Sequence, residues 1–146
     1  MTQARIHVVL GTAILLTTLA EVFYLVVWGM VLFPQGSLAG KAMWTLTCGV
    51  AMGAVIGAAT LVAIEPRYSG TAGLWRAALI VTVVGSYCAL LCSRIDARFG
   101  YFGGSEHAGL FIASGVVPAI AGGVFYGWLL YGWNTAQQKG SNEARG

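Results

Sequence analysis

One acidic residue stands inside a long apolar segment of this chain. The segment "LTTLAEVFYLVVWG" runs from Leu16 to Gly29, and Glu21 is its only charged residue. A carboxylate in the middle of a membrane-spanning helix is costly, so the group must face other helices, be protonated or accept hydrogen bonds. A carboxyl group in such a place can also bind and release a proton as its surroundings hydrate, which is chemistry that ion-coupled transport uses.

The polar neighbours expected around Glu21 offer hydroxyl groups and no cation. Tyr24 follows it on the same segment, and Ser86 is expected at a similar depth on another. Glu21, Tyr24 and Ser86 therefore form the candidate polar site, and two interpretations stay open. Glu21 either exchanges a proton during transport, or is a neutral acid whose hydrogen bonds hold helices together.

The stretch "GTAILLTTLAEV", residues 11–22, resembles the first helix of the small multidrug-resistance transporters. The resemblance implies a four-helix membrane protein that exchanges protons for cationic drugs, with Glu21 as the coupling glutamate. It is confined to this segment. The other three apolar segments do not show the pattern of that family, and neither Trp44 nor Trp75 clearly matches its substrate-lining tryptophan.

Sulfur and imidazole side chains form a second candidate group, expected in one half of the membrane. Its members are Cys48, Cys88, Cys92 and His107. Thiolate and imidazole ligands suit Cu(I), and an oxidising exterior would instead allow a disulfide between Cys48 and Cys88. Because cysteine is often buried as a small apolar residue, inert packing is the third interpretation.

Catalytic motifs are missing from the sequence. There is no CxxC, HExxH, GxSxG or GxxxxGK[ST] motif, and His7 and His107 are expected at opposite faces of the membrane, which disfavours a haem held by two histidines. A membrane enzyme needs several polar groups that converge at one depth. We therefore expect no enzyme activity and no cofactor, apart from bound lipid.

The elements that must position these residues follow from composition. Of the 146 residues, 58% are hydrophobic and 9% charged, against about 45–50% and about 25% in soluble domains. Apolar runs cover about 6–33, 42–64, 72–93 and 107–133, and each reaches or exceeds the roughly 20 residues that a membrane-spanning helix needs. The predicted fold is an all-α integral membrane domain, 1–146, with four transmembrane helices in an up-down bundle and a polar cytoplasmic tail at 134–146.

Basic residues predict the orientation of this bundle. An even number of helices places both termini on one side, and that side holds five basic residues while the other holds three. The first group is Arg5, Arg67, Arg76, Lys139 and Arg145, and the second is Lys41, Arg94 and Arg98. The excess favours cytoplasmic termini and localisation in a bacterial plasma (inner) membrane. Because the basic residues are dispersed, nucleic-acid binding is not expected.

Small residues recur every fourth position in two of the predicted helices. The second helix carries Gly49, Gly53 and Gly57, and the last carries Gly115, Gly123 and Gly127, with Ala119 between them. Such GxxxG-type stripes allow helix backbones to approach closely. A stripe left facing outward would pack against another subunit.

These features favour a small accessory subunit of a larger membrane complex, of the respiratory or oxygenase type. Its expected partners are other membrane subunits or further copies of the chain, together with membrane lipids. The alternative is a proton-coupled transporter that uses Glu21, and binding of lipid, quinone or pigment ranks below both.

Overall fold

In the computed structural model, the described residues are 3–63, 71–100 and 105–143, and they form helices and no strand. The chain runs through α1 (Gln3–Tyr24), η1 (Leu25–Leu32), α2 (Leu38–Ala63), α3 (Thr71–Phe99), η2 (Ser105–His107) and α4 (Ala108–Glu143). The predicted all-α class with four long helices is confirmed.

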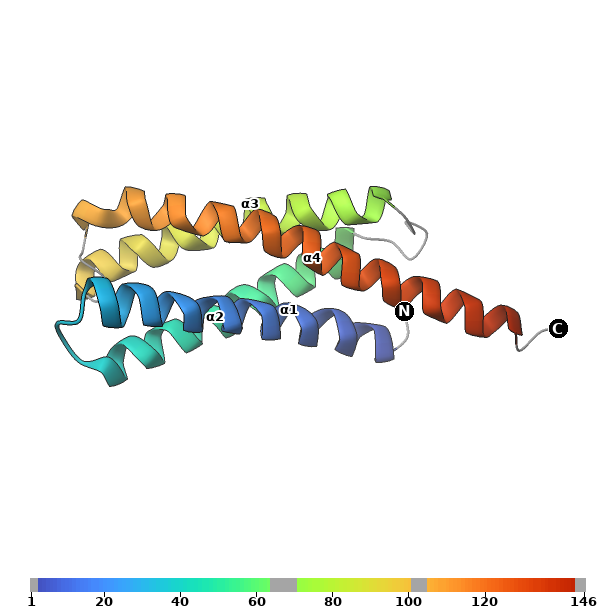
Figure 1. Cartoon of the computed structure of the whole chain (residues 1–146), viewed down its shortest axis with the longest axis horizontal. Coiled ribbons are helices and arrows are strands. Elements are labelled where there is room, and N and C mark those ends of the chain that lie inside the picture. The colour runs from blue at the N-terminus through green and yellow to red at the C-terminus, as the bar shows by residue number, and fades with distance from the viewer. Residues whose placement is uncertain (1–2, 64–70, 101–104, 144–146) are drawn as a thin grey trace.

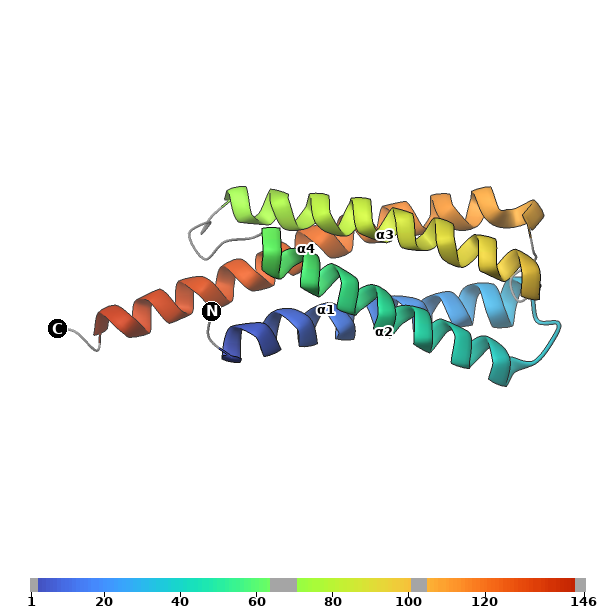
Figure 2. The ribbon, with the colours of Figure 1, turned by 180° about the vertical axis from the view of Figure 1, so that it is seen from behind.

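The four long helices form two antiparallel pairs. α1 and η1 pack along α2, and α3 packs along α4, while α2 and α3 supply the main contact between the pairs (Figures 1 and 2). Both chain ends lie at the same end of the bundle (Figure 1). α4 extends to Glu143 and continues beyond the other helices (Figure 1). The sequence predicted a polar tail from residue 134, and residues 134–143 of that tail are helical.

Within the described part of the chain, two helical segments are long and apolar enough to cross a membrane. They are Gln3–Leu32 and Leu38–Val62. The apolar parts of the other two long helices are shorter, Ala78–Cys92 in α3 and Val116–Gly132 in α4. The sequence predicted four membrane spans, and the described residues support two of them as candidates.

Glycines bring the two helices of each pair into close contact. A Cβ atom added to Gly53 of α2 would lie 2.5 Å from the Cα atom of Ile14 in α1. In the second pair, a Cβ atom added to Gly123 of α4 would lie 2.7 Å from the Cα atom of Ala78 in α3. These distances are far below van der Waals contact, so only glycine permits the observed approach of the backbones.

The remaining glycines of the two stripes are Gly49 and Gly57 on α2 and Gly115 and Gly127 on α4. Added Cβ atoms at Gly49 and Gly57 would lie 2.9 Å from Thr18 and 2.8 Å from Leu10, both on α1. Gly127 is buried on α4. Gly115 is also on α4, but its surroundings lie outside the described part of the structure. The stripe on α2 therefore faces a helix of its own chain.

A small core joins the pairs near the end that holds the termini. Its residues are Val9, Ala13, Ile56, Val81, Tyr126 and Leu130. Tyr126 is 2% exposed, and its hydroxyl group donates a hydrogen bond of 2.9 Å to the carbonyl oxygen of Val9. This bond is a direct polar link between α4 and α1, and it pairs a phenolic group that burial would otherwise penalise.

At the other end, a buried lysine closes the first helix. η1 is a π-helix, and the N–H group of Phe33 donates to the carbonyl oxygen of Trp28 at 2.9 Å. The Lys41 ammonium group donates to the carbonyl oxygens of Gly29, at 2.9 Å, and Phe33. Carbonyl groups at a helix C-terminus lack intrahelical donors and carry partial negative charge, so a cation satisfies them. The sequence assigned Lys41 to the membrane surface, whereas the structure leaves it only 1% exposed.

Candidate functional site

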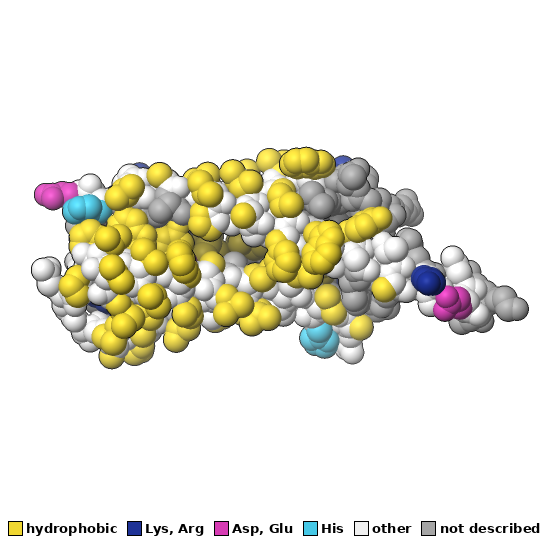
Figure 3. All heavy atoms as spheres, in the orientation of Figure 1, with side chains coloured by type: hydrophobic (Ala, Val, Ile, Leu, Met, Phe, Trp, Pro, Cys, Tyr) yellow, Lys and Arg dark blue, Asp and Glu magenta, His cyan; other side chains and the backbone are white. Residues whose placement is uncertain are grey.

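A cleft lies between the two helix pairs and is lined by all four long helices. The space inside the cleft, together with the open space at its mouth, is about 820 Å³. α1 and α4 touch little, and Figure 3 shows the surface hollowed between them. The residues that line it are Ala13, Leu16, Thr17, Ala20, Glu21, Tyr24, Met52, Ile56, Val81, Gly85, Cys92, Pro118, Ala119, Gly122 and Tyr126.

Small side chains create this cleft. Ala20 on α1 and Gly122 on α4 are among its lining residues, and a Cβ atom added to Gly122 would meet no atom within 4 Å. A larger residue at either place would occupy the space between the pairs. The cleft therefore follows from residue size at helix faces that the sequence alone does not orient.

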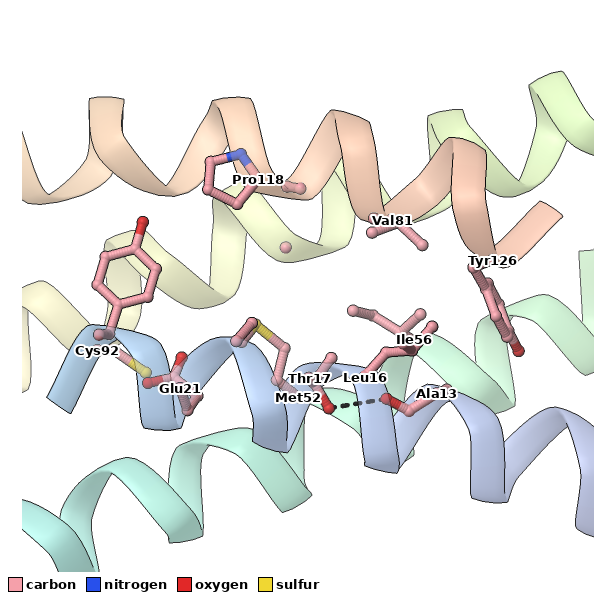
Figure 4. Close-up of a pocket in the computed structure, with 15 residues that line it drawn as sticks. Ala13, Leu16, Thr17, Glu21, Met52, Ile56, Val81, Cys92, Pro118 and Tyr126 are labelled. Atoms are coloured by element: carbon pink, nitrogen blue, oxygen red, sulfur yellow. Dashed lines mark hydrogen bonds between the residues drawn. The ribbon is translucent and has the colours of Figure 1, made fainter. Parts of the chain in front are cut away.

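Most of the lining is apolar, and Glu21 is the exception. It is the only described lining residue with a carboxyl group. Figure 4 shows it on α1, toward the opposite end of the cleft from Tyr126. An apolar cavity with one acidic group can hold an apolar ligand and fix the orientation of a positive charge on it.

Gly49 makes room for the Glu21 side chain. A Cβ atom added to Gly49 of α2 would lie 3.2 Å from the Cγ atom of Glu21. In the part of the chain that the structure describes, neither a cation nor a hydrogen-bond donor pairs with the carboxyl group. An unpaired carboxylate surrounded by apolar atoms is unfavourable, so a proton or a bound cation must neutralise it.

The nearby hydroxyl groups are placed in different ways. Tyr24 lines the cleft with Glu21, as the candidate polar site requires. Ser86 is half-buried on α3 but does not line the cleft, so the structure does not bring it to Glu21 there. Thr17 points its hydroxyl group at carbonyl oxygens, at 2.8 Å from that of Ala13 and 2.7 Å from that of Gly49. Its single proton is thus shared between acceptors on α1 and on α2, and the share that goes to Gly49 helps to hold the two helices together.

The sulfur group is brought together only in part. The Sγ atoms of Cys92 and Cys48 are 3.2 Å apart, across the contact between α3 and α2. Cys88 is half-buried one turn earlier on α3. The thiol nearest to Cys48 is therefore that of Cys92, where the sequence suggested Cys88.

The fourth member of that group, His107, lies at the end of the bundle opposite the chain termini (Figure 1). Its ring meets the ring of Phe33 edge-on, with 4.8 Å between the centroids. Among the residues with described positions, no three His, Cys, Asp or Glu side chains are close enough to share a metal ion. The described positions of Cys48, Cys88, Cys92 and His107 therefore do not support a copper site that all four residues share.

Two features near the site could not be predicted from the sequence. The first is Lys41 as the cap of η1, for which the short connection from Phe33 to Leu38 was the available signal, because it places the first turn of α2 beside the end of η1. The second is the contact of Cys48 with Cys92, because residue spacing within a helix does not determine how α3 is rotated about its axis relative to α2.

Comparison with known proteins identifies no relative. No protein-family model matches the sequence, and neither a curated protein nor a solved structure matches it.

Proposed function

We propose that the chain is a four-helix integral membrane protein that binds apolar organic cations at Glu21 in exchange for the carboxyl proton. The observation that carries this proposal is an apolar cleft, lined by all four long helices, in which the described residues supply one carboxyl group and no cation to pair with it.

The surface supports membrane insertion of the whole bundle. Large apolar side chains are exposed on each long helix, among them Leu15, Met43, Leu79 and Val117. Figure 3 shows that apolar atoms cover the middle of the visible face, while charged side chains lie toward its ends. Such a continuous apolar surface is suited to acyl chains and would promote aggregation in water.

The shorter apolar stretches of α3 and α4 are compatible with spanning. α3 has 29 residues, which corresponds to about 43 Å at 1.5 Å per residue, against about 30 Å of hydrocarbon. Arg76 and Arg94, both exposed, flank the apolar stretch of α3. Arginine can place its aliphatic stem along apolar surface and its charge at the headgroups, which extends the usable span.

The proposed orientation keeps both termini in the cytoplasm of a bacterial cell. Both ends lie on one side of the bundle, as that orientation requires (Figure 1). Lys41 bonds to helix carbonyl groups and is buried, so it adds little to the charge of the outer loops. The remaining asymmetry of basic residues then favours cytoplasmic termini more strongly than the sequence count did.

Proton and cation compete because the carboxyl group can be neutralised by either one. When the cleft is empty, a proton is the available neutralising group, and when an apolar cation enters, its charge takes that role. Glycine contacts close each helix pair internally, whereas the pairs themselves meet less extensively. Movement of one pair against the other is the proposed route by which the cleft changes its exposure.

A binding experiment tests this function. Purified protein in mild detergent is titrated with tetraphenylphosphonium, an apolar monovalent cation, over a range of pH. We expect binding to weaken as pH falls, by up to about tenfold per pH unit once the proton occupies the carboxyl group. The sign follows from competition, because a protonated carboxyl group has no charge with which to attract the cation.

Two variants make the same chemical change at different places. Glu21→Gln should abolish both the binding and its pH dependence, whereas Glu106→Gln, at an exposed acid outside the cleft, should leave both unchanged. Unaltered binding by a folded Glu21→Gln variant would show that the cleft does not use this carboxyl group.

An accessory, non-catalytic subunit of a membrane complex is the second candidate. The observation in its favour is the polar end of α4, which remains helical beyond the bundle (Figure 1). A polar helix that extends past the other described helices is suited to meet another component. Purification in mild detergent should then recover unrelated chains in a fixed ratio, whereas the transporter should purify and function alone or as a homo-oligomer.

A further inference from the structure

Two thiol groups meet where the helix pairs touch. Cys48 on α2 is 8% exposed, Cys92 is on α3, and their Sγ atoms are 3.2 Å apart. Neither residue is in a disulfide. Because α2 and α3 supply the main contact between the pairs, a covalent bond at this point would join one pair to the other.

The sulfur atoms are close to the positions that such a bond requires. A disulfide places its sulfur atoms about 2.05 Å apart, so the observed 3.2 Å must shorten by about 1.1 Å. Rotation about side-chain bonds or a small shift of α3 supplies movement of that size. Cys88 is on the same helix as Cys92, four residues earlier, and provides a built-in comparison.

Cys92 also determines which oxidants reach the pair. It lines the apolar cleft, near the end that holds Glu21 (Figure 4). The cleft admits an apolar molecule more readily than a strongly hydrated one, because entry of the latter would leave polar groups without hydrogen bonds. Organic hydroperoxides, which form on unsaturated acyl chains, have the required apolar character.

We propose that Cys48 and Cys92 are an oxidation site at which an organic hydroperoxide entering the cleft produces an intramolecular disulfide. The Cys92 sulfur loses its proton and attacks the terminal peroxide oxygen. The O–O bond breaks, and the alkoxide takes up a proton and leaves as an alcohol. The Cys48 thiol then attacks the sulfur of the resulting sulfenic acid, and the hydroxyl group departs as water with the Cys48 proton.

The reaction is balanced without a further reactant. Two thiols and one hydroperoxide give one disulfide, one alcohol and one water, so the dithiol supplies both electrons that reduce the peroxide. Cys92 lines the same cleft as Glu21, but the inference is distinct from the proposed cation exchange, because its readout is a disulfide and not binding at the carboxyl group.

Cumene hydroperoxide, an apolar organic hydroperoxide, serves as the probe. The full-length protein is treated in mild detergent, remaining thiols are counted with a maleimide, and linked peptides are identified by mass spectrometry. We expect the parent chain to lose two of its three thiols and to yield the peptide that links Cys48 to Cys92. Hydrogen peroxide, which is strongly hydrated, should react more slowly.

Variants separate the intended pair from the neighbouring thiol. Cys88→Ala should form the same link as the parent chain, and Cys92→Ala should form no link. The proposal is overturned by a dominant link to Cys88, by oxidation of single thiols without a link, or by the absence of reaction. Equal rates with the two peroxides would overturn entry through the cleft.

Discussion

Replacement of Gly53 by alanine tests how closely α1 and α2 approach. The added Cβ atom would lie 2.5 Å from the Ile14 Cα atom and 2.9 Å from its backbone nitrogen, against 3.4 Å for ordinary contact. It would also meet the Thr17 hydroxyl oxygen. Backbone atoms cannot rotate away, so the helices must separate by 3.4 − 2.5 = 0.9 Å.

That separation has a calculable cost. Overpacking of this kind costs about 1–3 kcal/mol, and weakening the hydrogen bond from Thr17 to the Gly49 carbonyl adds about 1 kcal/mol. Alanine recovers about 1 kcal/mol of helix propensity. The net expectation is a loss of about 1–3 kcal/mol in the free energy of unfolding.

Gly132→Ala is the matched control, because a Cβ atom there meets nothing within 4 Å. It should be neutral or stabilise by up to about 1 kcal/mol. Unfolding in mixed micelles with increasing denaturing detergent measures both variants. Equal stability of the two would refute the account of the glycine contact between α1 and α2.

Three further predictions concern the ends and the middle of the bundle. Tyr126→Phe removes the donor to the Val9 carbonyl group and should lower the free energy of unfolding by about 1 kcal/mol in the same micelle assay. An unchanged free energy of unfolding would show that this hydrogen bond does not stabilise the fold. Lys41→Met leaves the Gly29 carbonyl group without its donor and should cost about 2–3 kcal/mol, and a neutral result would show that water replaces the lysine. Gly122→Leu places a side chain into open space and should weaken tetraphenylphosphonium binding at least about tenfold, with stability retained; full binding would place the ligand elsewhere.

The helices themselves could be predicted from the sequence. Apolar runs at 6–33 and 42–64 correspond to Gln3–Leu32 and to Leu38–Ala63. Deviations occur where polar residues continue a helix, as α4 does to Glu143. Hydropathy marks the part of a helix suited to lipid, and carries little information on a polar extension. Passage of all four helices through a membrane stays a prediction, since two are long and apolar enough by themselves.

The candidate site was predicted only in part, because its geometry depends on helix rotation. The place of Glu21 within the first helix followed from the first apolar run, and its neighbour Tyr24 lines the same cleft. Ser86 does not line that cleft, and Cys48 meets Cys92. Residue spacing gives the face on which two side chains lie together, but it does not state which helix covers that face.

The structure also shows which helices the glycine stripes contact. The sequence allowed a stripe to face another subunit. In the structure, Gly53 meets α1 and Gly123 meets α3, both within the chain. The contacts at Gly53 and Gly123 therefore give no support to packing against another subunit, and assembly of the chain with other proteins stays a prediction.

The number of protons released per bound cation tests the central claim most directly. Tetraphenylphosphonium is added to the purified protein in weakly buffered solution, at a pH low enough that the empty carboxyl group is protonated, and the pH change is converted to released protons. We expect the parent chain to release about one proton per bound cation, and we expect Glu21→Gln to release none. Saturable binding by the parent chain without proton release would contradict exchange at Glu21.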